Sequence, residues 1–300
     1  MTRARDVANL QSGAIINEAG ADLDFRIESD DNANMFFIDG GNDKVGIGTN
    51  SPQQLLHVSA NNPGGKIRLE MGQSGVADGD VTGEIQFYHN DSSGAGVNAD
   101  IKGICTSAIG AGALTFGTGT TSTTERMRIA SDGSVGIGCT PKTFESGYDN
   151  LQIGGNIAIN VDSTGVGAGI YFSNNVYRDA TNSRWEYIYT DEATQYLQAS
   201  GTHRWRYASS GSADTAITWS EAMRIDNSGN VGIGTDNPQN LLHLEASSGA
   251  RMRFVDTGTQ AYTLGNSGTS LTLNNASQST TPLTITTSEA VFNDDSTNYD

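Results

Sequence analysis

The chain has 300 residues, of which 37 are glycine and 36% are hydrophobic, and its 17 basic and 34 acidic side chains give a formal net charge of −17. So small a supply of large apolar groups argues against one or two ordinary compact domains and predicts burial against neighbouring units or further copies. The negative charge and the absence of any Lys/Arg cluster disfavour nucleic-acid and anionic-membrane partners, and no apolar run is long enough for a membrane span.

The first segment, residues 1–13, holds the one stretch with helix potential, from Arg3 to Leu10. No apolar core follows its arginines, so it does not resemble a secretory leader. Cys105 and Cys139 are too few for a disulfide framework and lack the spacing of metal ligands. These features predict synthesis in a reducing cytoplasm.

One string recurs along the chain. VGIGTNSPQQLLHV at residues 45–58 returns as VGIGTDNPQNLLHL at 231–244 and, shortened, as VGIGCTP at 135–141. Repetition of this kind is typical of an array of supersecondary units. We therefore divide the chain into residues 1–13, a first repeat at 14–60, a β module at 61–141 ending in the second repeat, an aromatic-rich β module at 142–246 ending in the third, and a β module at 247–300 ending in an incomplete repeat.

Each VGIG copy alternates a branched residue with glycine, which is the period of a β-strand. Turn-forming residues precede each copy, so we expect hairpins whose second strand is VGIG. The prolines that follow should end the ladder and turn the chain. A glycine in a strand is typical of close approach by another backbone, which we expect at Gly46, Gly136 and Gly232. The predicted structural residues of the repeats are Gly46, Gly48, Gly136, Gly138, Gly232, Gly234, Pro52, Pro141, Pro238, His57 and His243.

A thin unit with glycine on one strand face cannot bury both faces by itself. Three copies around an axis would let the Val/Ile faces meet centrally, while the glycines admit the adjacent chain. Short strands bounded by glycine fill nearly all of the remaining sequence. The predicted fold class is therefore all-β.

For the candidate sites in the repeats, the sequence favours structural roles over binding or catalysis. His57 and His243 recur at equivalent positions, which favours a buried, hydrogen-bonded role over an ion site shared by three copies on an axis. The Asp-Gly pairs are typical of turns, and no calcium-loop pattern surrounds them. We predict no catalytic, cofactor-binding or metal residues.

The segment between Tyr171 and Tyr207 is rich in aromatic side chains with interleaved arginines. Its alternating aromatics predict two strands that each present an aromatic face. The favoured interpretation is the core of a β insert. The alternative is an exposed face that stacks on sugars or docks a protein. The candidate contact residues are Trp185, Tyr187, Tyr189, Trp205 and Tyr207.

The two ends of the sequence resemble each other, because residues 290–300 align without a gap on residues 14–24. In the first copy a second strand follows. We therefore expect the natural chain to continue past Asp300 into another VGIG hairpin.

The pattern VGIG-T-x-x-P-x-x-x-L-H-V, preceded by DFRIESD and MFFIDGGNDK, resembles the repeats of bacteriophage tail-fibre and related virion-fibre proteins. The match covers residues 14–60, 121–141, 217–246 and 290–300. The resemblance implies an elongated, repetitive fibre of short strands and hairpins, built as an intertwined parallel homotrimer. It also implies a virion structural protein that mediates host recognition or adhesion, without enzymatic activity. In that family an endosialidase-type intramolecular chaperone often follows such repeats, and none is present in these residues.

The resemblance also suggests partners. We expect residues 1–13 to attach the fibre to other virion proteins and the fibre to contact a host cell-surface glycan or protein. Two alternatives are a capsid-mounted fibre and a polysaccharide depolymerase, which would need two close acids in a cleft. A secreted bacterial adhesin is disfavoured, since no leader is apparent.

Overall fold

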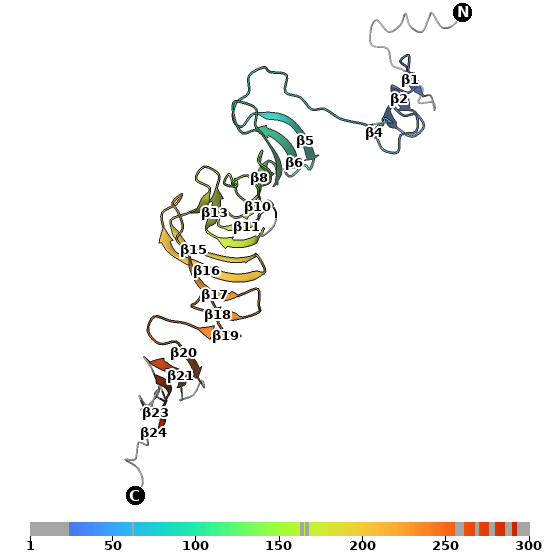
Figure 1. Cartoon of the computed structure of the whole chain (residues 1–300). Coiled ribbons are helices and arrows are strands. Elements are labelled where there is room, and N and C mark those ends of the chain that lie inside the picture. Colours follow the sequence, from blue (N-terminus) through green and yellow to red (C-terminus); the bar gives the residue numbers. More distant parts are fainter. Residues whose placement is uncertain are drawn as a thin grey trace, which may run out of the picture. The chain divides into compact units, whose positions relative to one another are not determined.

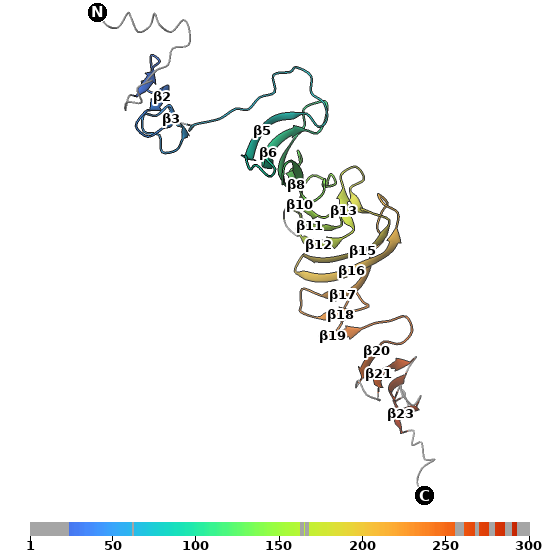
Figure 2. The ribbon, with the colours of Figure 1, turned by 180° about the vertical axis from the view of Figure 1, so that it is seen from behind.

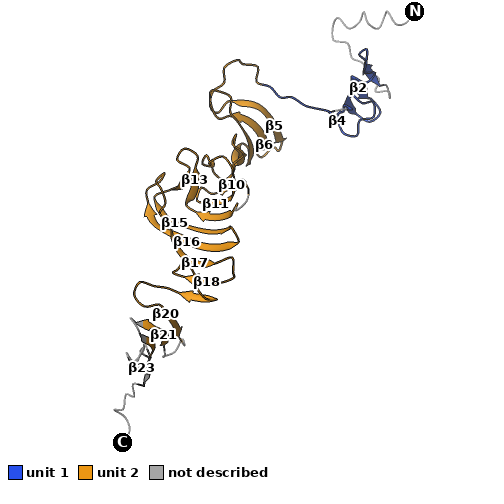
Figure 3. Ribbon diagram, viewed as in Figure 1, with its two compact units in different colours: residues 1–70 blue, residues 71–300 orange. Residues whose placement is uncertain are grey.

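The computed structural model describes residues 24–61, 63–162, 165, 168–255, 261–267, 270–275, 280–285 and 290–292. The chain divides into two compact units, Met1–Glu70 and Met71–Asp300 (Figure 3). The predicted attachment segment 1–13, its helix, the first residues of repeat 1 and the last eight residues of the incomplete repeat lie outside the described residues.

The first unit contains one four-stranded sheet in the order β1-β2-β3-β4. Its strands are β1 (Phe25–Ile27), β2 (Phe36–Asp39), β3 (Lys44–Ile47) and β4 (Leu56–Val58). The β2–β3 hairpin turns through Asp43, whose φ is 55°, and its second strand is the VGIG copy. The predicted hairpin is confirmed here.

The second unit is built on a thirteen-stranded sheet whose strands follow one another in chain order, with one excursion (Figures 1 and 2). The strands are β5 (Val81–His89), β6 (Gly96–Cys105), β7 (Gly112–Gly119), β8 (Thr123–Ile129), β9 (Val135–Ile137), β10 (Tyr148–Ile153), β11 (Ile157–Asp162), β12 (Ile170–Asn174), β15 (Asp191–Ala199), β16 (Thr202–Gly211), β17 (Ser220–Ile225), β18 (Val231–Ile233) and β19 (Leu242–Leu244). The excursion is a two-stranded ribbon of β13 (Val176–Asp179) and β14 (Arg184–Tyr187) between β12 and β15.

A five-stranded antiparallel meander completes the second unit. It consists of β20 (Arg251–Val255), β21 (Ala261–Ser267), β22 (Ser270–Asn275), β23 (Thr280–Ile285) and β24 (Ala290–Phe292). All of the described regular structure is therefore β, as predicted, and it is arranged in open sheets. The predicted division at residue 141 does not coincide with a break, because β9 pairs with β10 across it.

The VGIG glycines do meet a backbone, but it belongs to the same chain. A Cβ on Gly46 would stand 2.2 Å from the carbonyl oxygen of Thr49, and one on Gly136 would stand 2.3 Å from that of Cys139. At Gly232 the corresponding contact is 2.7 Å, to Thr235. The expectation that these glycines admit an adjacent chain is thus corrected. The corner after each strand folds back over the glycine and fills the space.

The second glycine of each copy ends its strand. Gly48, Gly138 and Gly234 have φ of 79°, 68° and 75°, which is the left-handed region that favours glycine. Pro52, Pro141 and Pro238 then lie buried in the corners. The prolines turn the chain as expected.

The ladder does not end at the corners, which differs from the prediction. The chain returns after each corner and adds a strand parallel to VGIG, with Val45 opposite Leu56 and Val231 opposite Leu242. In repeat 2 the added strand is β10, where Leu151 lies opposite Val135. The prolines stand outside these strands, so they remove no ladder hydrogen bond.

Candidate functional site

The burial pattern of the central strands is reversed relative to an ordinary sheet. In β10 to β12 the buried positions include Asn150, Asn160 and Ser173, whereas Ile157 and Phe172 are 51% and 41% exposed. Since side chains alternate across a strand, the polar residues share one face and the apolar residues the other. We call these the polar face and the apolar face.

Cross-strand register extends the apolar face over the whole thirteen-stranded sheet. The central row of direct partners is Leu244, Ile233, Met223, Trp205, Tyr196, Phe172, Ile159, Leu151, Val135, Ile129 and Leu114. A second row on the same face is Tyr207, Thr194, Asn174, Ile157, Ile153, Ile137, Met127, Phe116, Ile101 and Ile85. Neither row contains a charged residue.

The polar face is covered from within the chain. Two clusters of buried side chains combine sheet alanines with residues of the β13–β14 ribbon and its flanks. In one, Ala158 packs with Tyr177 and Phe144; in the other, Ala193 and Ala208 pack with Tyr187. The ribbon therefore lies over the polar side of the sheet at β11, β15 and β16, and in the single chain the apolar side of these strands stays exposed.

Several buried polar groups on this face accept or donate hydrogen bonds, whereas Nδ2 of Asn150 and Oδ1 of Asn160 are buried without a hydrogen-bond partner. Asn160 donates through Nδ2 to Oδ1 of Asn150 over 2.8 Å, and Gln195 donates to Oγ of Ser173 over 2.8 Å. The backbone N–H of Lys142 donates to Oε1 of Gln152 over 3.0 Å. Such pairing offsets the cost of removing amides from water.

The sheet of the first unit has the same two-faced character. Alternation and register put Ile27, Ile38, Val45, Ile47 and Leu56 on one face. Ile47 is 41% and Leu56 55% exposed, while Phe37 and Gly46 on the opposite face are buried. The first unit thus also leaves an apolar face uncovered.

The five-stranded sheet also presents an apolar face, although β20 leaves side chains exposed on both of its faces, with Phe254 57% and Val255 59% exposed. Met252 pairs with Leu264, and Phe254 with Tyr262, so all four share one face. A shallow hollow of about 320 Å³ is lined by Leu242 and Leu244 of β19 together with Met252, Leu264 and Leu271. The apolar surfaces of the two sheets of the second unit therefore meet at this hollow.

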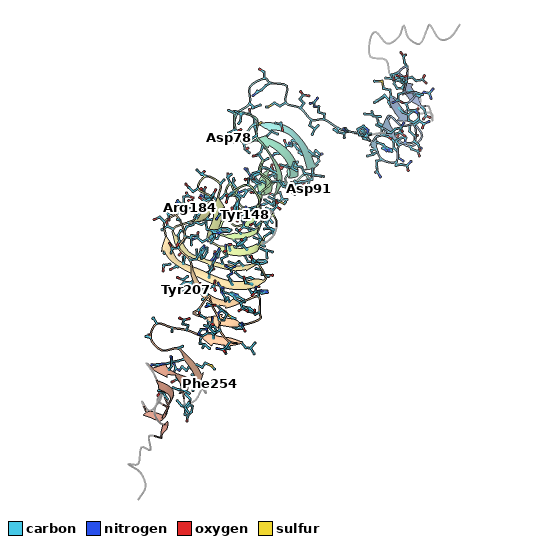
Figure 4. All side chains as sticks on the ribbon, in the orientation of Figure 1. Asp78, Asp91, Tyr148, Arg184, Tyr207 and Phe254 are labelled. Atoms are coloured by element: carbon cyan, nitrogen blue, oxygen red, sulfur yellow. The ribbon has the colours of Figure 1, made fainter. Side chains whose placement is uncertain are left out.

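The candidate contact residues do not form one patch. Trp205 and Tyr207 lie on the apolar face of β16, 36% and 51% exposed, and Tyr207 is labelled in Figure 4. Tyr187, the last residue of β14, is buried between the ribbon and the sheet, and its hydroxyl donates to the carbonyl of Ser209 over 2.7 Å, so an exposed role for it is wrong. Tyr189 is 50% exposed, beyond the end of β14.

Trp185 belongs to a packed cluster beside the polar face. Its ring lies 4.9 Å from that of Tyr171, and the guanidinium groups of Arg178 and Arg206 lie 5.6 and 6.0 Å from its centre. Burial lowers the pKa of Arg206 to about 10. The favoured interpretation, aromatics in the core of an insert, describes Trp185 and Tyr187.

A stripe of aromatic rings crosses three adjacent strands of the apolar face. The ring centres of Phe172 and Tyr196 are 6.0 Å apart, and those of Tyr196 and Trp205 are 4.9 Å apart. The Tyr196 hydroxyl lies 2.6 Å from Nδ1 of His203. We call Phe172, Tyr196, His203, Trp205 and Tyr207 the aromatic level.

A shallow hollow of about 530 Å³ opens on the aromatic level, lined in part by Phe172, Tyr196, Trp205, Tyr207 and Ile157. Sequence reasoning did not single out Phe172 and Tyr196. Their signal was the alternation of β12 and β15, Ile-x-Phe and Thr-x-Tyr, which only register joins to Trp205.

The structure also brings two acidic residues, Glu186 and Asp214, to the same tyrosine hydroxyl, which the sequence did not predict. The hydroxyl of Tyr177 lies 2.8 Å from Oε2 of Glu186 and 2.9 Å from Oδ1 of Asp214. Arg184 donates to the other Glu186 oxygen over 2.8 Å, and Lys142 lies 2.7 Å from Asp214. Hydrogen bonds from Lys142 and then Tyr177 lower the pKa of Asp214.

This acid pair is suited to holding the ribbon in place. Glu186 is 2% exposed, and both of its oxygens already accept hydrogen bonds. Burial, followed by hydrogen bonding to Glu186, raises the pKa of Tyr177. The cluster ties β13 and β14 to the segments around residues 142 and 214.

The repeated histidines serve the corners. The backbone N–H of Gln53 donates to Nδ1 of His57 over 3.4 Å, and Gln239 does the same to His243. Both histidines lie opposite a VGIG glycine, away from the apolar face. Among the described residues, no group of three or more His, Cys, Asp or Glu side chains is arranged to hold a metal ion.

Comparison with known proteins adds no family. No protein-family model matches the chain, and no curated protein matches it. In the part of the chain that the structure describes, no helix is long and apolar enough to cross a membrane.

Proposed function

We propose that this chain is the structural subunit of a virion fibre, a phage tail fibre that assembles as a parallel homotrimer and carries a host-recognition surface away from the particle. The observation that carries the proposal is the apolar face. The four-stranded and the thirteen-stranded sheets each bury residues on one side and expose apolar side chains on the other, and the five-stranded sheet exposes apolar side chains as well. The resemblance of the VGIG modules to virion-fibre repeats supplies the biological setting.

The exposed face demands a partner on energetic grounds. Monomeric soluble proteins rarely expose a contiguous apolar patch larger than a few hundred Å². Here Ile85 and Phe87 at one end of the thirteen-stranded sheet are 52% and 53% exposed, and Ile233 near the other end is 43% exposed. Burying half of such a side chain contributes about 1 kcal/mol, so the summed gain over many strands is large.

Charge allows further copies of the same chain to be that partner only if they meet through a neutral surface. Copies that each carry a net charge of −17 repel one another. The two rows of the apolar face contain no charge, so a contact through them keeps the acidic surfaces apart. Depletion of charge is also what distinguishes the core of an interface.

Three parallel copies, the number that the resemblance implies, would enclose the apolar faces around one axis. The polar faces and the β13–β14 ribbons would then point outward, where a host glycan or protein can be contacted. In this arrangement the chain is a structural and adhesive element with no catalytic role. It needs no cofactor.

The test is the mass of the folded chain in solution. Sedimentation equilibrium at micromolar concentration should give three times the chain mass of 31.6 kDa, with β-rich circular dichroism. Antibodies against the chain should label projections on virions. A folded monomer, or virions without label, would overturn the proposal.

A further inference from the structure

A trimer built on the apolar face has a register problem. From β7 to β11 the central row is Leu114, Ile129, Val135, Leu151 and Ile159, all aliphatic and similar in size. Sliding one copy by two strand positions, about 10 Å, replaces one aliphatic side chain of this row by another. This stretch by itself cannot specify how the copies align along the axis.

The aromatic level is different in both size and chemistry. Phe172, Tyr196 and Trp205 follow one another on β12, β15 and β16, and the row beside them carries Asn174 and Thr194. Among the described rows of the apolar face, this is the one place where three adjacent strands contribute bulky rings together with amide and hydroxyl groups.

We propose that the aromatic level fixes the axial register of the assembly by packing against the same level of the two other copies. This inference rests on the proposed trimer. A copy that is displaced by two strands would still place Trp205 against Phe172, but it would face the other two rings with non-aromatic side chains. Those two rings would then be left without partners of matching width.

The hollow supports this occupant. A close-packed protein interior leaves few voids larger than a water molecule. The opening of about 530 Å³ beside Phe172, Tyr196 and Trp205 is open to solvent in the single chain and can take groups from outside the chain. Most of its lining residues belong to the two charge-free rows, with Arg206 as a charged residue among the others, so a largely neutral surface suits it.

The polar atoms at this level are compatible with burial in an interface. The Tyr196 hydroxyl already has a hydrogen-bond partner, Nδ1 of His203 at 2.6 Å. Burying this pair in an interface therefore leaves the Tyr196 hydroxyl with its hydrogen bond. Thr194 and Asn174 are exposed and bring hydroxyl and amide groups to the seam. Polar groups inside an apolar seam are a known means of setting register, because a shifted copy would leave them unpaired.

Disulfide cross-linking between two levels tests the inference. In a background with Cys105→Ala and Cys139→Ser, one chain carries Ile137→Cys on β9 and a second, mass-tagged chain carries Ile157→Cys on β11. These positions lie two strands apart in the same row. The two chains are refolded together and oxidised. A fixed register gives links between like positions, with links between unlike positions as a trace.

The variant Phe172→Leu/Tyr196→Leu/Trp205→Leu keeps the face apolar but removes the rings. We expect it to remain trimeric while links between unlike positions rise to a share comparable with links between like positions. The matched control, Leu114→Ala/Val135→Ala/Leu151→Ala, removes similar contacts from the aliphatic stretch. It should lower the melting temperature and keep links between like positions.

Each outcome is decisive. A triple Leu variant that stays trimeric and links only like positions would overturn the register role while leaving the trimer intact. Equal amounts of both links in the unaltered seam would overturn it as well. A monomeric parent chain would instead overturn the proposed function. Should the triple variant not fold, Trp205→Leu alone gives the same readout, because that side chain is 36% exposed in the single chain.

Discussion

The corner after each VGIG strand packs against the first glycine of the copy, where a side chain larger than hydrogen would collide with it. Gly136 is buried, and the carbonyl oxygen of Cys139 and Cδ of Pro141 would stand 2.3 and 2.7 Å from a Cβ at that position. Both atoms belong to the corner that folds back over the strand. The glycine therefore lets one chain cover its own polar side, and burial of Pro141 follows from the same contact.

We expect Gly136→Val to lower the unfolding free energy by about 1–3 kcal/mol, because the corner must move to admit the branched side chain. Thermal unfolding followed by circular dichroism measures the effect. Gly72→Ala is the matched control, since a Cβ there meets nothing within 4 Å and its melting temperature should not change. Equal melting of Gly136→Val and the parent chain would show that the corner is not packed in this way.

The sequence predicted that a backbone lies close to the VGIG glycines, but it did not predict which chain that backbone belongs to. Repetition of Gly46, Gly136 and Gly232 indicated a close backbone. It did not say whose backbone, because a corner three residues away and a second chain leave the same glycine signal. Alternation along the strand also predicted the same face for Tyr187 and Tyr189. Tyr187 is buried and Tyr189 is half-exposed, because β14 ends at Tyr187.

At the scale of elements, the polar face of β6 and its neighbours is held by a buried ion pair. Asp100 accepts from Lys102 at 2.8 Å and from Thr123. Burial raises the pKa of the Asp100 carboxyl, but the hydrogen bonds from Lys102 and Thr123 outweigh it and leave the pKa below its ordinary value. Its folded pKa is thus lower than its unfolded one.

The sign of the pH effect follows from that difference. A lowered folded pKa contributes stability above the unfolded pKa of about 3.9, and this stability is lost as the pH falls through the folded value. We expect Asp100→Asn to cost about 1.5–3 kcal/mol of unfolding free energy at pH 7.

Denaturant titrations from pH 7 to pH 2 measure this effect. The difference in unfolding free energy between parent and variant should shrink below about pH 4. A gap that stays constant would contradict the assignment, and the exposed Asp31→Asn serves as control.

The ribbon provides a second element-scale prediction. Tyr177→Phe removes the hydroxyl shared by Glu186 and Asp214 and leaves a buried carboxylate oxygen without its donor. The expected loss of unfolding free energy is about 1–3 kcal/mol. Tyr207→Phe, at a half-exposed hydroxyl on the apolar face, should cost much less. Similar losses in the two variants, measured by denaturant unfolding, would mean that the cluster does not hold the ribbon.

The hairpins could be predicted from the sequence, whereas the returning strands and the covered side could not. Turn residues and alternation identify β2–β3, β8–β9 and β17–β18 directly. The three-residue strand Leu56–Val58 carries no turn signal of its own, so its parallel pairing was missed. Alternation separates two faces of a sheet but does not say which of them the chain covers, and the β13–β14 ribbon covers the polar one.

At the scale of the whole molecule, the two central rows of the apolar face are free of charge, while Asp149 lies on the same face of β10 outside these rows. The chain carries 34 acidic side chains, yet the two described rows of the apolar face in the second unit hold none of them. In a monomer this arrangement exposes the surface that water tolerates least. In an assembly it puts the neutral surface inside and the acidic surface outside, where repulsion between particles keeps them soluble.

A charge placed in the apolar face should therefore separate assembly from folding. Ile233 is 43% exposed on β18, so Ile233→Glu can keep its carboxylate in water in the single chain. In a trimer the same substitution would bury three like charges close together, at a cost of several kcal/mol for each buried ion. We expect sedimentation to give a monomer at micromolar concentration and circular dichroism to remain that of a β protein.

The matched control places the same charge off the apolar face. Ile109, at the tip of the β6–β7 hairpin, is 93% exposed, and Ile109→Glu should leave the trimer mass unchanged. If both variants stay trimeric, the interface lies elsewhere than the apolar face. If both become monomeric, added negative charge alone dissociates the assembly, and the face has no special part in it. Dissociation of Ile233→Glu alone is the outcome that a trimer built on this face requires.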